Sequence, residues 1–308
     1  MTTGIALLGP LVVHGEGGRP AVALGPRDRV VLAALAVPHG EVVSAERLAD
    51  ALWGERPPAS WNKVVPGCVM RLRKALGAAA IGTTAHGYRL AVPGEEIDAQ
   101  RFERMVRRGG ELLTLGESER AAHVLGEALA MWRGPPLIEL AEWEPGRTEA
   151  IRLHELRLHA EEARLDACLK SGRHREVLSE AQARVAEAPL RERRWALLAL
   201  AQYLAGGQGD ALRTLRQARS VLASELGVDP GPELAALEQA ILRQDPALVV
   251  EAAPAAASVM CPYLGLVPYD VGDAEAFFGR DLEITECVRR LATTEVLAVV
   301  GPSGSGKS

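Results

Sequence analysis

The chain has 308 residues and a net charge of −5, and 48% of its residues are hydrophobic while 4% are aromatic. The length suits about two domains, and the composition favours helices packed through Ala and Leu over a sandwich of short strands. No stretch reaches the roughly 20 apolar residues that cross a bilayer, and no basic segment leads into an apolar run at the start. We therefore expect a cytoplasmic protein without a membrane partner.

The four cysteines offer no recognisable metal or disulfide pattern. Cys68, Cys168, Cys261 and Cys287 are far apart, with no CxxC pair and no histidine at ligand spacing. A zinc site and a disulfide framework are therefore not indicated, and we expect no metal. Reduced thiols packed in helices are the expectation.

The charge is spread unevenly along the chain. Residues 1–95 hold ten Lys and Arg against seven Asp and Glu, a net +3, so the remainder carries −8. The overall negative charge argues against a nucleic-acid partner, but the basic excess at the N-terminus indicates where one would bind. A modest excess of this kind is also common on ordinary surfaces.

The first 95 residues alternate short apolar runs with helical patterns. The runs at 4–13 and 21–24 predict a β-hairpin. Pro26 opens a helix that ends near Pro38, and Ser44 caps a shorter helix that stops at Gly54.

A third helix is expected over about 60–76, followed by a hairpin over 81–92. Its apolar residues recur at core spacing, and Gly77 ends it: Trp61, Val65, Cys68, Leu72 and Leu76. The later hairpin turns around His86 and Gly87. A strand pair, three helices and a hairpin together predict a winged helix-turn-helix domain over 1–95.

Residues 96–245 have a helical pattern interrupted by glycine and proline, including breaks at Gly109-Gly110 and at Pro189. Gly172 and the residues after it match Gly206 and its followers at an offset of 34 residues, which is the period of tetratricopeptide-like helix pairs. The segment from Gly116 is similar. A tetratricopeptide-like helical array is the prediction, with a generic helical bundle as the alternative.

The last part of the chain predicts a Pro/Ala-rich linker over 246–260 and the start of a P-loop α/β domain over 261–308. The final residues match GxxxxGK[ST] directly after an apolar strand. Glycines let backbone N–H groups wrap phosphates, while the lysine neutralises phosphate oxygens and the serine ligates Mg²⁺. The residues concerned are Gly301, Gly304, Gly306, Lys307 and Ser308.

The P-loop ends the sequence before its helix, a Walker-B acid or a catalytic carboxylate. We therefore expect no enzyme activity and no cofactor in this chain, and a truncated ATPase domain that would take Mg-ATP only in a full-length form. A chance Gly/Ser-rich loop is the alternative to a P-loop.

The third predicted helix carries residue types that recognise DNA. A helix fits the major groove, where polar side chains reach base edges and Lys or Arg neutralise phosphates. Asn62 and Lys63 near its start are candidates for base contact, and contact with the DNA backbone or groove is expected from Arg71, Arg73 and Lys74. Each basic residue taken singly is also compatible with a solvated surface.

Longer runs resemble a known family. Residues 7–92, with LLGPLV from Leu7, ALWG from Ala51 and RLRKAL from Arg71, closely resemble the OmpR-like winged-helix domain of SARP (antibiotic regulatory protein) transcriptional activators. Residues 98–234, from DAQRF to ELGVDPGPEL, are similar to the bacterial transcriptional activator domain of that family. The segment with PYLG from Pro262, FFGR and the P-loop is similar to the start of a STAND-type ATPase domain.

The resemblance implies a mainly α protein with a small β content that binds direct repeats in double-stranded promoter DNA as a homodimer. It further implies recruitment of RNA polymerase, through its sigma and alpha subunits, to genes of secondary-metabolite (antibiotic) biosynthesis. In the family the third helix is the recognition helix and the hairpin is the wing, which places Arg89 on the wing.

Two departures concern individual contacts. Pro66 and Gly67 fall inside the recognition helix, so this helix either begins later, which would place Asn62 and Lys63 in a loop, or kinks. Thr84 stands where related wings often place an arginine for the minor groove.

Two other classes of function compete with a transcriptional activator. One is a STAND-type signalling NTPase whose main output is its nucleotide state. The other is a peptide-binding scaffold built on the tetratricopeptide-like array.

Overall fold

The computed structural model describes residues 4–14 and 23–248, together with positions 285, 287, 289 and 290. Contacts divide the chain into one compact unit of Met1–Val250 and a second of Glu251–Ser308. All helices and strands named below belong to the first unit. The P-loop residues Gly301–Ser308 lie outside the described residues, as does the predicted linker from residue 249 onward.

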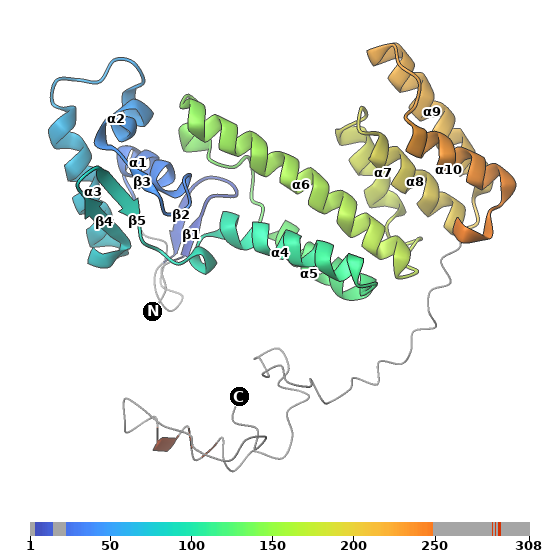
Figure 1. The fold of residues 1–308 in the computed structure, drawn as a ribbon, viewed down its shortest axis with the longest axis horizontal. Coiled ribbons are helices and arrows are strands. Elements are labelled where there is room, and N and C mark those ends of the chain that lie inside the picture. Colours follow the sequence, from blue (N-terminus) through green and yellow to red (C-terminus); the bar gives the residue numbers. More distant parts are fainter. Residues whose placement is uncertain (1–3, 15–22, 249–284, 286, 288, 291–308) are drawn as a thin grey trace. The chain divides into compact units, whose positions relative to one another are not determined.

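The N-terminal part of the first unit is a winged helix-turn-helix (Figure 1). In chain order its first elements are β1 (Gly4–Ala6), β2 (Val12–His14), α1 (Pro26–Ala36), β3 (Val42–Val43), α2 (Ala45–Trp53) and α3 (Trp61–Leu76). The wing follows as β4 (Ile81–Thr84) and β5 (Gly87–Leu90). The three later strands form an antiparallel sheet in the order β3-β5-β4.

The N-terminal hairpin differs from its prediction. β1 pairs with β2 inside the first apolar run, with Ile5 opposite Val13, whereas Ala23 and Leu24 are not in a strand. Residues 21–22 lie outside the described part. The tight return is possible because Gly9 adopts a φ of 145°.

The two-residue strand β3 is too short to give an alternating pattern, and it was not predicted. Val43 lies opposite Tyr88 in the register with β5. A Cβ on Gly87, whose φ is 144°, would lie 2.1 Å from the carbonyl oxygen of Val43. Glycine at this position therefore lets the wing approach the backbone of β3.

The C-terminal part of the first unit is the tetratricopeptide-like helical array (Figure 1). Consecutive helices pack on one another within the pairs α4–α5, α7–α8 and α8–α9, and α6 packs on both α5 and α8. The helices are α4 (Asp98–Thr114), α5 (Ser118–Ala130), α6 (Glu144–Lys170), α7 (Leu178–Glu187), α8 (Glu192–Leu204), α9 (Gln208–Leu226) and α10 (Pro232–Arg243).

The sequence repeat corresponds to a repeated helix end. Gly116, Gly172 and Gly206 follow α4, α6 and α8, with positive φ values of 78°, 81° and 95°. In each case the glycine N–H donates to the carbonyl of the residue three positions earlier. Such left-handed glycines satisfy the last carbonyls of a helix. The same glycine turn therefore follows the first helix in the successions α4–α5, α6–α7 and α8–α9, which supports the predicted repetitive array over a generic bundle.

The break expected at Gly109-Gly110 is absent, because α4 continues to Thr114. A Cβ on Gly109 would lie 2.5 Å from Cγ of Leu125 in α5. The glycine lets the two helices pack closely, and this packing outweighs its poor helix propensity.

The winged helix and the first helices of the array share one hydrophobic core. Residues from β1, α1 and α3 bury their side chains in the same cluster as Phe102 of α4 and Leu125 of α5. Asp98 accepts hydrogen bonds from the N–H groups of Leu7 at 2.6 Å and Leu8 at 3.1 Å. Both residues are buried, so their N–H groups cannot bond to water. The carboxylate of Asp98 is the acceptor that these donors would otherwise lack.

Candidate nucleic-acid interface

In the winged domain, α3 lies on the side away from the helical array (Figure 1). α3 buries Val65, Cys68, Val69 and Leu72 against the domain core, which orients the opposite face outward. This helix is therefore the element free to enter a DNA groove.

Pro66 lies inside α3, which begins at Trp61. The alternative of a later helix start is thereby excluded, and Asn62 and Lys63 occupy the first turn of the helix. Pro66 carries no N–H, so the carbonyl of Asn62 has no helical donor. Both first-turn side chains are exposed.

Three of the predicted cations are exposed and free of ion pairs within the described part of the chain. Lys63 and Lys74 extend from α3, and Arg89 extends from β5 of the wing. A lysine or arginine without a carboxylate neighbour can neutralise a phosphate without first breaking an ion pair. Asn62 is likewise exposed and unpaired there.

Arg71 differs from these residues because it is held by a carboxylate of α1. Its Nε and Nη2 donate to Asp28 at 2.9 and 2.7 Å, and the Asp28 side chain is 8% exposed while that of Arg71 is 52% exposed. Burial alone would raise the pKa of Asp28. The hydrogen bonds and charge of Arg71 outweigh burial and hold this pKa below its ordinary value of 3.8. The pair joins α1 to α3, and about half of the Arg71 side chain still faces solvent.

Arg73 joins α3 to the wing. Its guanidinium donates twice to the carbonyl of Ile81, at 2.9 and 2.7 Å, and once to the hydroxyl of Thr83 at 2.6 Å. These bonds fix the start of β4 relative to the helix. Arg73 is thus a positioning residue for the wing in this conformation.

The wing turn is held by Thr84. Its hydroxyl donates to the carbonyl of Gly87 at 3.3 Å and accepts from the N–H of His86 at the same distance. Thr84 therefore stabilises the tip on which a related wing would carry an arginine.

Met70 is an exposed residue of α3 that was not among the candidates for DNA contact, because those were chosen for polar or charged side chains. It lies on α3 one turn after Pro66 and one turn before Lys74, and its side chain is 68% exposed. The signal was available, since residues four apart share a helix face. The outer face of α3 consequently combines an apolar centre with flanking lysines.

Cys68 and Cys168 are buried in α3 and α6 as free thiols. Burial raises the pKa of the Cys68 thiol to about 11, and the nearby Asp28 carboxylate adds to the increase. A thiol with this pKa stays protonated at neutral pH and is a poor nucleophile or metal ligand.

A cluster that sequence reasoning did not find joins the winged helix to α6. His39, Glu103 and Glu149 point ligand atoms at one another, with His39 Nε2 3.6 Å from Glu149 Oε1. Arg152 pairs with both carboxylates, at 2.7 Å in the case of Glu149. The guanidinium already supplies the positive charge that a metal ion would bring, so we assign this cluster to ion pairing.

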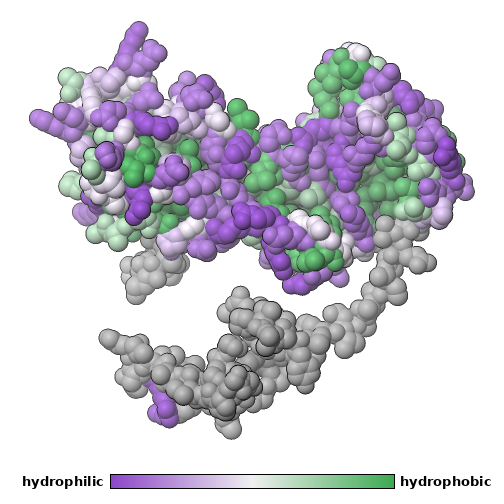
Figure 2. Space-filling view, in the orientation of Figure 1, coloured by the Kyte–Doolittle hydropathy of each residue, from purple (hydrophilic) through white to green (hydrophobic). Residues whose placement is uncertain are grey.

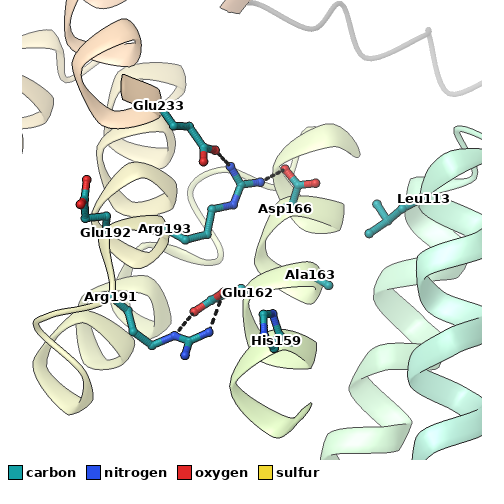
Figure 3. Close-up of a pocket in the computed structure, with 9 residues that line it drawn as sticks. All are labelled: Leu113, His159, Glu162, Ala163, Asp166, Arg191, Glu192, Arg193 and Glu233. Carbon is teal, nitrogen blue, oxygen red and sulfur yellow. Dashed lines mark hydrogen bonds and ion pairs between the residues drawn. The ribbon is translucent and has the colours of Figure 1, made fainter. Parts of the chain in front are cut away.

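The array contains a charged pocket of about 550 Å³ between α6 and α8. Figure 3 shows Arg193 between Asp166 and Glu233, and Arg191 against Glu162. The nearest atoms of these pairs are 2.5 to 3.4 Å apart. Each arginine of the pocket is already neutralised by a carboxylate of the chain, so neither is free to bind an anionic ligand.

Comparison with known proteins matches three family models in succession. They are Transcriptional regulatory protein, C terminal, at residues 18–90, Bacterial transcriptional activator domain at 97–242, and Novel STAND NTPase 1 at 262–308. Regulatory protein DnrI of Streptomyces peucetius is 35% identical over 268 residues, covering 83% of this chain and 98% of DnrI. The chain belongs to the SARP family of transcriptional regulators.

Two further similarities extend over nearly the whole chain. Regulatory protein AfsR of Streptomyces griseus is 36% identical across 98% of this chain, which spans 31% of the length of AfsR. The solved structure of Mycobacterium tuberculosis EmbR in complex with low affinity phosphopeptide has 32% identity and a TM-score of 0.74. That likeness covers 94% of this chain and 71% of the EmbR chain.

The described part of this SARP chain includes no helix that is long and apolar enough to cross a membrane.

Proposed function

We propose that this SARP chain is a sequence-specific DNA-binding activator that inserts α3 into the major groove of promoter DNA. One observation carries the proposal. The outer face of α3 bears Asn62, Lys63 and Lys74 without carboxylate partners among the described residues, and Arg89 extends from the adjacent wing. Hydrogen-bonding groups on a helix read base edges, and free cations bind phosphates.

Arg71 and Arg73 act differently in this proposal. Their bonds to Asp28 and Ile81 hold α3 and the wing in place, and the exposed half of Arg71 also faces the DNA. Family membership supports the remaining steps: a homodimer binds direct repeats and recruits RNA polymerase through its sigma and alpha subunits. The regulated genes are those of secondary-metabolite biosynthesis, and the protein acts in the cytoplasm.

DNase I footprinting on promoters beside its own gene, with and without RNA polymerase, tests this function. We expect protection of repeated sequences in the presence of competitor DNA, with an extended footprint when polymerase is added. Loss of protection in competitor DNA would instead favour a protein-binding scaffold.

Lys63→Ala and Lys74→Ala test the assigned face in a salt titration of DNA affinity. Each variant should reduce the slope of log affinity against log salt by about 0.9, the value for one lost phosphate contact. Arg107→Ala is the matched control, because Arg107 is exposed on α4 and has no ion pair among the described residues. An unchanged slope for both lysine variants would remove them from the interface.

The P-loop motif supports a second candidate, a signalling NTPase. Gly301, Gly304 and Gly306 would wrap phosphates, with Lys307 and Ser308 toward the β/γ-phosphates and Mg²⁺ in a complete domain. We expect DNA binding to need no cofactor. Calorimetric titration with Mg-ATP tests the candidate, with Lys307→Ala as control, and binding that Lys307→Ala abolishes would support it.

A further inference from the structure

An apolar groove lies between the segment that follows α5 and the first turns of α6. It has a volume of about 690 Å³, and its walls include Trp132, Pro135, Ile138, Arg147, Ile151 and Arg157. We name it the Trp132 groove. Ile138 and Ile151 are 52% and 61% exposed, so two large aliphatic side chains face water in one groove. Figure 2 shows that the apolar patches of the visible face are separated by hydrophilic surface.

The charge of the groove is one-sided. Among the described residues that line it, Arg147, His154 and Arg157 are basic and none is acidic. Arg157 stacks on Trp132 with its guanidinium carbon 5.0 Å from the ring centroid, and it pairs with Glu161 at 3.0 Å. Arg147 has no carboxylate partner in the described part of the chain. An occupant with carboxylates would therefore complement the rim.

Trp132, which lines the groove, carries a buried hydrogen-bond donor without an acceptor among the described residues. The indole Nε1 of Trp132 is shielded from solvent and bonds to no described residue. A buried donor of this kind is destabilising unless a partner supplies an oxygen.

The segment that forms one wall of the groove is hydrogen-bonded to the N-terminal hairpin of the winged helix. The N–H of Arg133 donates to Leu8 at 2.7 Å, and the N–H of Leu137 donates to Leu7 at 3.2 Å. A preformed wall reduces the conformational entropy lost when a partner docks.

We propose that the Trp132 groove docks an acidic, apolar segment of a partner protein. Apolar side chains of the segment pack on Ile138 and Ile151, and its carboxylates face Arg147. The inference concerns the array and does not depend on DNA binding by α3.

Two synthetic amphipathic helices provide the test, one with Leu and Glu faces and the other with Lys in place of every Glu. The full chain is labelled with nitrogen-15 tryptophan, and the Trp132 indole signal is assigned with Trp132→Phe among the five tryptophans. The Glu peptide should shift this signal saturably, whereas the Lys peptide should not.

Charge reversal at Arg147 and a polar substitution at Ile151 test the charged and apolar parts of the groove separately. Arg147→Glu should weaken binding of the Glu peptide by about threefold or more, the effect of one rim ion pair, and should improve binding of the Lys peptide. Ile151→Ser should weaken it as well. The matched controls are Arg107→Glu and Leu115→Ser, both at exposed positions outside the groove. Unchanged signals from the other tryptophans show that each variant is folded.

Three results would overturn the proposal. They are an unshifted Trp132 signal with both peptides, equal affinity for the two peptides, and unaltered affinity after Arg147→Glu. Self-association of the chain that Ile151→Ser abolishes would also overturn the proposal, because the groove would then hold a second copy.

Discussion

Asp28 and Arg71 show how one residue of α3 can serve two purposes. The carboxylate is nearly buried, so it needs the hydrogen bonds that Arg71 donates. Those bonds orient the arginine along α3 while leaving half of it in solvent. A side chain that the sequence offers only as a DNA contact is thus also part of the link between α1 and α3.

Replacing Asp28 tests that link through its pH dependence. Because the folded-state pKa lies below 3.8, the carboxylate stabilises the fold fully above the unfolded-state pKa and loses this effect as pH falls through the folded value. Asp28→Asn should lower the free energy of unfolding by about 1.5–3 kcal/mol near neutral pH, as for hydrogen bonds to charged groups. In urea unfolding the difference from wild type should shrink between about pH 6 and about pH 3.

Asp210→Asn is the matched control, since Asp210 forms an exposed i,i+3 pair with Arg213 and should change stability by less than about 1 kcal/mol. A difference for Asp28→Asn that stays constant across this pH range would contradict the assigned pairing.

Met70 makes a separate prediction about base recognition. An apolar side chain in the major groove recognises the C5-methyl group of thymine. After selection of a binding site from random duplexes, replacing one thymine by deoxyuracil should weaken wild-type binding by about fourfold, the effect of one buried methyl-sized group. Met70→Ala should bind both duplexes equally in fluorescence anisotropy.

Leu115→Ala is the control for Met70→Ala, because Leu115 is 67% exposed but follows α4. If deoxyuracil at each thymine in turn changes the affinity of wild type and of Met70→Ala equally, Met70 does not contact a thymine methyl group. That result would stand even if the protein binds DNA.

At the scale of elements, glycine residues allow neighbouring helices and strands to pack closely. Gly109 brings α5 against α4, and Gly87 brings the wing against β3. Both positions look like breaks or turns in the sequence. Only the partner element shows that the missing Cβ makes room for packing.

Gly87→Ala should therefore destabilise the wing. Its Cβ would meet the backbone of Val43, and its φ of 144° disfavours a side chain, so a loss of about 1–3 kcal/mol is expected. Gly110→Ala is the control: its Cβ meets nothing within 4 Å in a helix, and it should gain about 0.5–1 kcal/mol. Thermal unfolding of both variants measures the effect, and equal melting temperatures would refute it.

At the scale of the whole molecule, the winged helix is attached to the array by satisfied polar groups as well as by shared core. Glu139 accepts from the N–H of Leu11 at 2.9 Å and from Arg29 at 2.6 Å, and the indole of Trp143 donates to Asp50 at 2.9 Å. With Asp98, these residues fix the winged helix, and α3 within it, relative to the array. DNA binding by α3 and partner binding by the array would then occur on one rigid body.

Asp98→Ala tests this attachment. Two buried amides would lose their acceptor, each at a cost of about 1–3 kcal/mol. Urea unfolding should show this loss, and limited proteolysis should cut near residues 7–11 sooner than in wild type. Glu95→Ala, at a side chain that is 77% exposed, should leave both measurements unchanged. Equal behaviour of the two variants would show that the shared core suffices.

The sequence by itself determined the order of the helices of the first 95 residues, the wing, the repeated helix turns and the residues along α3. Those features follow from local periodicity, caps and turn residues, which neighbouring positions along the chain specify. Only the tertiary structure decided that α3 runs through Pro66, that Gly109 lies inside a helix, and that Arg71 and Arg73 are held by Asp28 and Ile81. The pairing of Arg71 with Asp28 joins residues 43 positions apart, so no local pattern announces it. Such contacts depend on how complete elements pack, and packing separates the free cations of α3 from those that hold it in place.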